Sequence, residues 1–172
     1  MIYILTGAIR TGKTTALFDW INDRDDVDWI NDRDDVDGLL CPDNENGKRY
    51  FLKIKKNEDF NLEAEAEVES EDVITIGSFK FLKAAFKEAN DYLISTASET
   101  ENRYLIIDEI GKLELNKEGL HRSAEVLIPK YMLDENQHLL FVVRDYLLDA
   151  VLKHYAITEY SLLGKEDIKW FG

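Results

Sequence analysis

Cysteine and proline are scarce in this 172-residue chain, which contains one cysteine, Cys41, and two prolines. A single cysteine excludes an intramolecular disulfide and a zinc site built on cysteines. No apolar run reaches the roughly 18 residues of a membrane span, and no basic segment precedes the apolar residues 2–5. We therefore expect no membrane partner and no secretory signal, and the expected compartment is the cytoplasm.

Positive charge is also scarce. The net charge is −14, and two segments account for all of it, because residues 19–37 contribute −7 and residues 57–72 contribute −8. Neither these segments nor the nearly neutral remainder offers the basic stripe that nucleic-acid binding requires, so we expect no nucleic-acid partner. The length suits a single domain over residues 1–172 with one large core.

A perfect tandem repeat interrupts the chain. Residues 20–28 read WINDRDDVD, and residues 29–37 repeat the same nine letters. Two such short acidic units cannot stack into a solenoid core, so we interpret the repeat as an insertion in one connection. In a continuous helix the second Trp-Ile pair would lie on the opposite face from the first. We expect one copy to pack against the fold, and an oligomer contact through residues 20–37 is an open alternative.

Short apolar runs alternate with helical patterns along the rest of the chain. Buried strands are expected at residues 2–5, 104–107 and 139–143, and short strands at 38–41 and 73–76. A half-exposed strand is expected at 48–56, an edge strand at 62–69, and a last strand near 156–162 before a polar tail. Helices are expected at residues 13–20, 79–97, 118–132 and 145–154. This order predicts an α/β fold: a mainly parallel sheet flanked by helices, with an antiparallel hairpin addition from residues 38–76.

Residues 7–14 read GAIRTGKT and fit the phosphate-loop pattern G-x-x-x-x-G-K-[ST], between a predicted strand and a predicted helix. The glycines allow close approach of the backbone to phosphate, the lysine neutralises the β- and γ-phosphates, and the helix directs its N-terminal dipole at the anion. The predicted nucleotide-binding residues are Gly7, Ala8, Ile9, Arg10, Thr11, Gly12, Lys13, Thr14 and Thr15. The dinucleotide pattern G-x-G-x-x-G is absent, which disfavours a Rossmann site.

Two acids follow the predicted strand at 104–107. A phosphate loop needs a carboxylate at the end of a neighbouring strand to hold Mg²⁺ together with the loop hydroxyl, and Asp108 and Thr14 fit these roles. Glu109 is the candidate that orients and activates the attacking water. The alternative is that both acids simply begin a polar loop, or that Glu109 is a structural acid.

Four segments resemble a known family. They are Leu5–Thr15, the sequence GLLCP at 38–42, the sequence GKRYF at 47–51, and the sequence IIDEIGKLEL at 106–115. Together they are similar to the small nucleoside-triphosphatases of the cancer-related nucleoside-triphosphatase family. The resemblance implies a RecA-like P-loop fold and Mg²⁺-dependent hydrolysis of several nucleoside triphosphates, and it implies that Lys13, Thr14, Asp108 and Glu109 occupy active-site positions. Members have also been grouped with nucleotide kinases. The chain departs from the family in its longer connection at 20–37 and its more acidic segment at 57–72.

Other candidates are weaker. Arg144 follows the predicted strand at 139–143 and either neutralises charge that develops on the γ-phosphate or forms a surface ion pair with a residue such as Asp145. Arg49 either reaches the nucleotide or caps its hairpin. The sequence NKEG at 116–119 lacks the carboxylate of a guanine-reading N-K-x-D motif, because Gly119 takes its place.

These features favour a hydrolase that converts a nucleoside triphosphate and water to the diphosphate and phosphate, with Lys13, Glu109 and Arg144 in catalysis and Mg²⁺ as cofactor. ATP is the expected substrate, with GTP and other triphosphates as further candidates. Beyond residue 103 the only arginines are Arg122 and Arg144, which modestly disfavours a kinase with an arginine-rich lid. A nucleotide or small-metabolite kinase and a nucleotide-gated interaction module remain the alternatives.

Overall fold

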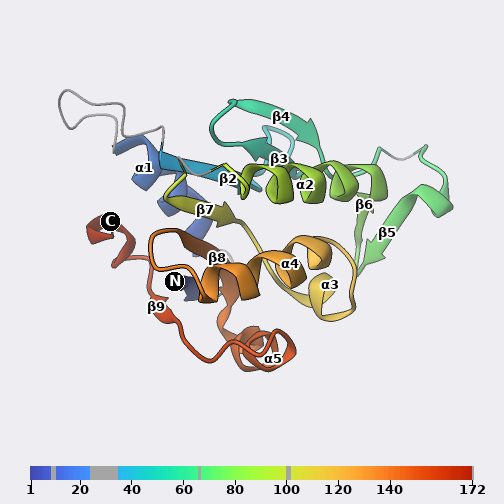
Figure 1. Ribbon diagram of the computed structural model, residues 1–172. Helices are drawn as coiled ribbons and strands as arrows, with labels where there is room; N and C mark the ends of the chain where they lie inside the picture. Colours follow the sequence, from blue (N-terminus) through green and yellow to red (C-terminus); the bar gives the residue numbers. More distant parts are fainter. Residues whose placement is uncertain (9–10, 24–34, 66, 100–101, 172) are drawn as a thin grey trace.

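The computed structural model describes residues 1–8, 11–23, 35–65, 67–99 and 102–171, and within them a seven-stranded, mainly parallel sheet forms the centre of the protein (Figure 1). The strands lie in the order β4-β3-β2-β7-β8-β1-β9. Their bounds are Ile2–Gly7 for β1, Val36–Leu40 for β2, Tyr50–Lys53 for β3, Glu58–Asn61 for β4, Tyr104–Ile107 for β7, His138–Arg144 for β8 and Ser161–Leu163 for β9.

The sheet confirms the predicted α/β architecture and its antiparallel addition. Strands β2, β7, β8, β1 and β9 are parallel, whereas β3 and β4 add to β2 in antiparallel fashion. A separate antiparallel pair, β5 (Val73–Ile76) and β6 (Phe79–Leu82), projects from the body of the molecule (Figure 1). β8 lies between β1 and β7, so the strand of the phosphate loop and the strand of Asp108 are not adjacent.

Helices cover both faces of the sheet. Their bounds are Lys13–Asp23 for α1, Lys83–Thr96 for α2, Lys112–Leu115 for α3, His121–Met132 for α4 and Leu148–His154 for α5, with 3₁₀ turns at Ser70–Asp72, Asp145–Leu147 and Ile168–Trp170. Successive side chains of β7 alternate between the two faces. Leu105 and Ile107 join the cluster beneath α2 and α4, whereas Tyr104 and Ile106 join the cluster beneath α1. Burial on both faces explains why this strand is apolar throughout.

Two predicted elements are wrong in their bounds. Phe79 was expected to begin a helix, but residues 79–82 form β6, and the helix begins at Lys83. Gly77, with a φ of +59°, turns the chain so that Phe79–Leu82 pairs with Val73–Ile76, and this pairing overrides the helical spacing. The edge strand expected at 62–69 is also wrong: β4 lies earlier, at Glu58–Asn61, and Glu63 makes only an isolated bridge.

The C-terminal segment is more than the polar tail that the sequence suggested. Ile168 is buried in the cluster beneath α1, and the indole N–H of Trp20 donates a hydrogen bond of 2.7 Å to the carbonyl oxygen of Phe171. Apolar residues at 168 and 171 are too few for a periodic pattern, so no local pattern predicts this packing. The segment after β9 is therefore fixed against α1, the helix that follows the phosphate loop.

The first copy of the repeat begins within α1, and the second copy ends within β2. Trp20 and Ile21, which begin the first copy, are buried in α1, and Val36 and Asp37, which end the second copy, lie in β2. This agrees with the expectation that one Trp-Ile pair continues the first helix and packs on the sheet. Residues 24–34, which include the second pair, lie outside the described residues. None of the described helices has the length and apolar character of a membrane span.

Candidate active site

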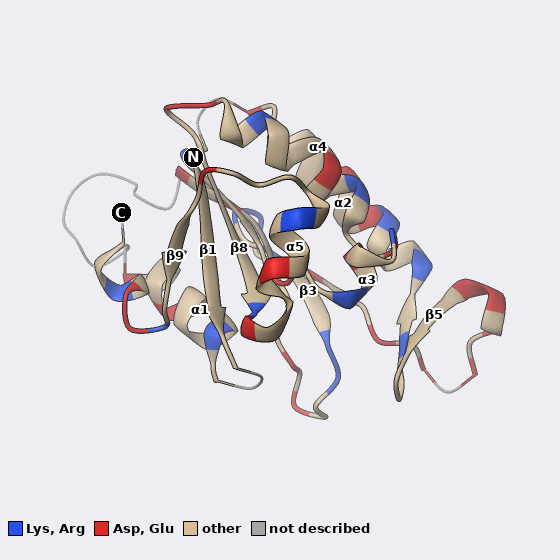
Figure 2. Ribbon diagram, turned by 90° about the horizontal axis from the view of Figure 1, so that it is seen from below, with Lys and Arg blue, Asp and Glu red and all other residues tan. Residues whose placement is uncertain are grey.

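The predicted site residues gather at one edge of the sheet. The parallel strands β1, β7 and β8 all end at this edge, and Figure 2 shows β1 and β8 pointing the same way toward it. The phosphate loop follows β1, Asp108 and Glu109 follow β7, and Arg144 is the last residue of β8. In open α/β sheets this carboxyl edge is where ligands bind.

The phosphate loop joins β1 to α1. Gly12 has a φ of +78°, a conformation that favours glycine, and its carbonyl oxygen accepts a hydrogen bond of 2.9 Å from the N–H of Ala16. The helix begins at Lys13, so its first N–H groups have no acceptor within the helix and are available to an anion. The predicted contacts of Ile9 and Arg10 lie outside the described residues.

Lys13 is held inside its own loop. The side chain is only 8% exposed, and its ammonium group donates to the carbonyl oxygens of Gly7, at 3.1 Å, and Ala8, at 2.6 Å. The hydroxyl of Thr11, which was predicted to lie in the binding loop, donates to Ala8 as well, at 2.9 Å. An ammonium group that donates to neutral carbonyl groups gains stronger hydrogen bonds when negatively charged phosphate oxygens replace them.

Thr14 and Asp108 meet although they are 94 residues apart. The hydroxyl of Thr14 donates a hydrogen bond of 2.8 Å to Oδ2 of Asp108, and the backbone N–H of Cys41 donates to the same oxygen at 3.1 Å. Asp108 is 3% exposed, and burial raises the pKa of its carboxyl to about 6, against the opposing effect of these hydrogen bonds. A cation beside this carboxylate would offset the cost of its burial.

Glu109 and Arg144 are joined to each other. The guanidinium Nε of Arg144 lies 2.6 Å from Oε1 of Glu109, and each side chain is about one quarter exposed. The ion pair links the ends of β7 and β8 and places both groups at the rim of the site. The sequence had suggested Asp145 as the partner of a purely structural Arg144, whereas the partner in the structure is the other catalytic candidate.

Arg49 lies beside the site on the antiparallel addition. Its backbone N–H donates to the carboxylate of Glu63 at 3.0 Å, and its guanidinium lies 5.5 Å from the centre of the Phe79 ring. Its positive charge also lowers the pKa of Asp108, although burial dominates there. Arg49 is therefore fixed within the hairpin and electrostatically coupled to the site.

Glu114 is the last acid of the segment at 106–115 that resembles the family, and its environment differs from those of Asp108 and Glu109. It is 4% exposed, and its carboxylate accepts hydrogen bonds of 2.8 Å from the N–H groups of Gly111 and Leu120. Burial raises the pKa of Glu114 to about 7, although these hydrogen bonds oppose the shift. The contacts stabilise the corner between α3 and α4. No pattern in the sequence reveals that this acid accepts backbone N–H groups.

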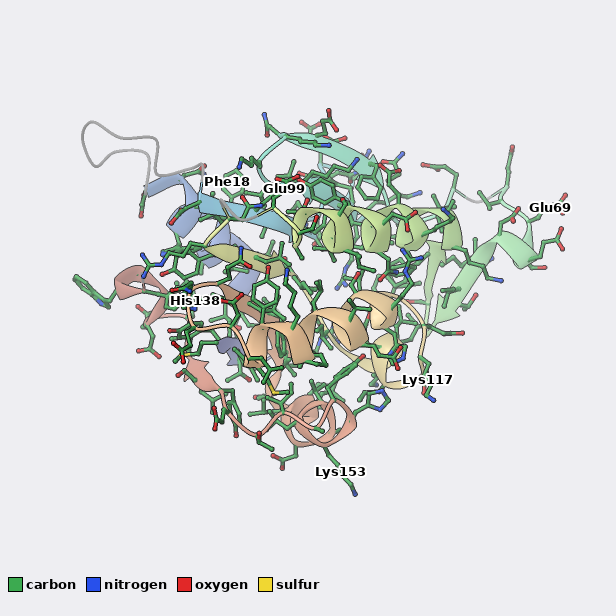
Figure 3. All side chains as sticks on the ribbon, viewed as in Figure 1. Phe18, Glu69, Glu99, Lys117, His138 and Lys153 are labelled. Carbon is green, nitrogen blue, oxygen red and sulfur yellow. The ribbon has the colours of Figure 1, made fainter. Side chains whose placement is uncertain are left out.

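The NKEG segment is also distant from the phosphate loop. Lys117 adopts a φ of +61° at the end of α3, and Figure 3 shows its side chain directed outward on the far side of the molecule from α1. This placement agrees with rejecting a guanine-reading motif at 116–119.

A buried hydroxyl–carboxylate pair at the end of a phosphate loop, on a mainly parallel sheet, defines a P-loop nucleoside triphosphatase fold. The chain matches the protein family described as NTPase over residues 2–163, and it belongs to that family.

Two solved structures share the fold. The crystal structure of THEP1 from the hyperthermophile Aquifex aeolicus gives a TM-score of 0.67 at 18% identity, with 97% of this chain and 92% of that chain covered. The solution structure of a human cancer-related nucleoside triphosphatase gives a TM-score of 0.63 at 16% identity, with 98% and 91% covered. A comparison with curated protein sequences gives no match. The suspected family is thus confirmed, and at these identities the two structures support the fold alone.

Proposed function

We propose that the protein hydrolyses nucleoside triphosphates to diphosphates and phosphate, with Mg²⁺ as cofactor and with little selectivity for the base. The observation that carries this proposal is the hydrogen bond between the hydroxyl of Thr14 and the carboxylate of Asp108. It joins the start of α1 to the end of β7, as metal-assisted phosphoryl transfer in P-loop enzymes requires. Membership in the NTPase family supports the same activity.

The donor set fits a magnesium ion. A hydroxyl that donates its hydrogen keeps oxygen lone pairs, and Asp108 has a second carboxylate oxygen besides the one that accepts from Thr14 and Cys41. Among the described residues no cluster of three His, Cys, Asp or Glu side chains is placed to hold a metal. Mg²⁺ in NTP enzymes takes one or two protein oxygens together with phosphate oxygens and water, so Thr14 and Asp108 suffice. When bound, the ion would neutralise charge on the β- and γ-phosphates.

The remaining roles belong to the side chains around the ion. Lys13 would exchange its carbonyl acceptors for oxygens of the β- and γ-phosphates. Arg144 holds Glu109 through Oε1, which leaves Oε2 to orient water and accept its proton. As water oxygen bonds to the γ-phosphorus, the bond to the β–γ bridging oxygen breaks, and the diphosphate leaves with that electron pair. Arg144 at the rim of the site would neutralise charge on the γ-phosphoryl group as it is transferred to water.

Release of phosphate from a panel of nucleotides tests the proposal. Purified protein is incubated with ATP, GTP, CTP or UTP, each with Mg²⁺ or with excess chelator and without any acceptor. We expect phosphate release from all four nucleotides, and none with chelator. Release that requires an added nucleotide or metabolite acceptor would favour a kinase. Binding without release would favour a nucleotide-gated module, and release confined to one nucleotide would refute base tolerance.

A further inference from the structure

Lys165 lies in the segment after β9, at the same edge of the sheet as the phosphate loop. β9 pairs in parallel with β1, with Leu163 opposite Leu5, so both strands reach this edge together. A tight turn follows, in which the carboxylate of Asp167 accepts a hydrogen bond of 2.7 Å from the N–H of Gly164. The chain then continues to Ile168, whose side chain is buried. Lys165 is therefore an exposed residue on a backbone that is anchored on both sides.

The Lys165 side chain extends over the phosphate loop. A Cβ atom built on Gly12 would lie 3.4 Å from the ammonium nitrogen of Lys165 and 3.8 Å from its Cε atom. No described residue forms an ion pair with Lys165. The neighbouring Lys169, by contrast, lies 3.7 Å from the carboxylate of Glu166. The carboxylate of Asp167, in the turn, already accepts a hydrogen bond from the N–H of Gly164.

This position places a second positive charge beside the end of α1 that would face an anion. The N-terminus of α1 carries the positive end of the helix dipole, and the ammonium group of Lys13 is already buried beside it. A second lysine at the same place raises the local positive potential further. A bound phosphate group would interact favourably with both lysines.

The sheet order indicates which phosphate Lys165 can reach. β1 is flanked by β8 on one side and β9 on the other. The proposed reacting groups, Glu109 and Arg144, belong to the β7 and β8 side, where the γ-phosphate must lie. Lys165 comes from the β9 side and approaches the loop at Gly12. The part of the nucleotide on that side is the end away from the γ-phosphate.

We propose that Lys165 is a substrate-binding residue that contacts the α-phosphate of the bound nucleotide. This inference rests on the proposed function, because it takes the phosphate loop to hold a nucleotide. The α-phosphate is common to nucleoside di- and triphosphates and is independent of the base. Lys165 therefore strengthens the binding of substrate and product equally, and does not discriminate the transition state. Such uniform binding lowers KM and leaves kcat unchanged.

The test compares Lys165→Ala with Lys169→Ala, which removes the same charge from the same segment. Calorimetric titration measures the affinity of each variant for Mg-ADP, Mg-GDP and their non-hydrolysable triphosphate analogues. One charge-assisted contact predicts about a tenfold loss of affinity for all four ligands in Lys165→Ala. We expect changes under about twofold in Lys169→Ala, and recovery of most of the affinity in Lys165→Arg. In the hydrolysis assay, KM should rise by the same factor while kcat stays constant.

Several results would overturn this role. Unchanged affinity in Lys165→Ala would make the residue a surface lysine. A loss confined to the adenine or the guanine ligands would make it a base-reading residue, and a loss confined to the triphosphates would place it at the γ-phosphate. Because binding is measured without turnover, the two proposals fail separately. A wild type that binds nucleotide without hydrolysing it would refute the proposed function and still decide the role of Lys165.

Discussion

Two polar regions of this protein each bury a charged side chain, but they differ in how their polar groups are satisfied. At the nucleotide edge, Lys13 rests on two loop carbonyls and Arg144 on Glu109, and the carboxyl of Asp108 accepts from the phosphate loop itself. At the α3–α4 corner, the carboxyl of Glu114 accepts two backbone N–H groups from its own segment.

This difference distinguishes groups that are available to a ligand from groups that stabilise the fold. A phosphate can displace the carbonyl groups that Lys13 contacts at the nucleotide edge, because they are neutral acceptors. The partners of Glu114 are backbone groups that no ligand replaces. A raised carboxyl pKa occurs in both regions, at Asp108 and at Glu114, so a perturbed pKa does not by itself mark a functional acid here. Substitutions at the edge should change activity, and substitutions at the corner should change stability.

Lys13→Ala should have the largest effect on activity. Loss of the ammonium group removes the charge that stabilises the β- and γ-phosphates, so we expect turnover to fall by about 10³-fold and triphosphate binding to weaken strongly. The free energy of unfolding should change by about 1 kcal/mol or less, because only hydrogen bonds to loop carbonyls are lost. Calorimetric titration with a non-hydrolysable triphosphate and urea unfolding measure the two effects.

The control is Lys153→Ala on α5, whose side chain points away from the body of the molecule (Figure 3). It removes the same charge and should leave turnover unchanged. Wild-type affinity in Lys13→Ala would refute the phosphate-loop assignment, and an unfolded variant would mean that the edge is architectural after all.

Glu109→Gln should separate binding from chemistry. The amide keeps the shape of the side chain but cannot take the proton of water, so kcat should fall by about 10²-fold or more while Mg-nucleotide affinity is retained. Losing the partly exposed ion pair with Arg144 should change stability by about 1 kcal/mol or less. Single-turnover kinetics and titration measure these values, with Glu99→Gln, an exposed acid after α2, as the control. Turnover at the wild-type rate in Glu109→Gln would make Glu109 structural.

Glu114→Gln should change the pH dependence of stability. The carboxyl ionises near 4.5 in the unfolded chain and near 7 in the folded protein. Between these values the folded protein holds a proton that the unfolded chain has lost. Stability from this group is therefore greatest below pH 4.5, falls as the pH rises toward 7, and is constant above it. The total loss of stability from pH 4.5 to above pH 7 is up to about 3 kcal/mol. Glu114→Gln removes this pH dependence.

The difference in stability between the wild type and Glu114→Gln therefore depends on pH. Near pH 5 the variant should be less stable by about 2 kcal/mol, because an amide cannot accept from both Gly111 and Leu120. This difference should shrink or reverse near pH 8, while turnover of the folded variant stays within about threefold of wild type. Urea unfolding at several pH values measures it. Parallel stability curves for the two proteins would contradict the buried-acid assignment.

The sequence predicted the placement of the candidate site residues better than the periphery, for physical reasons. The meeting of Thr14 with Asp108 was predictable because the phosphate-loop pattern fixes residue types at fixed spacings beside apolar strands. Phe79 was misassigned because the four residues FKFL at 79–82 fit both periodicities, and only their pairing with β5 decides between them. The location of Lys165 could not be predicted, since it depends on the pairing of β9 with β1 and on the burial of Ile168, which are tertiary contacts without a local pattern.

Deletion of residues 20–28 should have the smallest effect, because it touches neither polar region. The copies are identical, so removing either one gives the same protein, in which a single WINDRDDVD unit joins Asp19 to Gly38. That unit still supplies the Trp-Ile pair that α1 buries and the Val-Asp pair that begins β2. Shortening a connection by nine residues changes the closure entropy by about 1 kcal/mol or less. We expect turnover within a few-fold of wild type and an equal or higher Tm.

Size-exclusion chromatography of the parent and the deletion variant decides whether the repeat has a further role. If both are monomers with similar turnover, the second copy is dispensable. A parent dimer that becomes a monomer on deletion would support a contact through residues 20–37, or an exchange of α1 between chains that the longer connection permits. An unfolded or inactive monomer would refute dispensability. One unit would then be too short to serve both α1 and β2, since Trp20 and Asp37 now come from different copies.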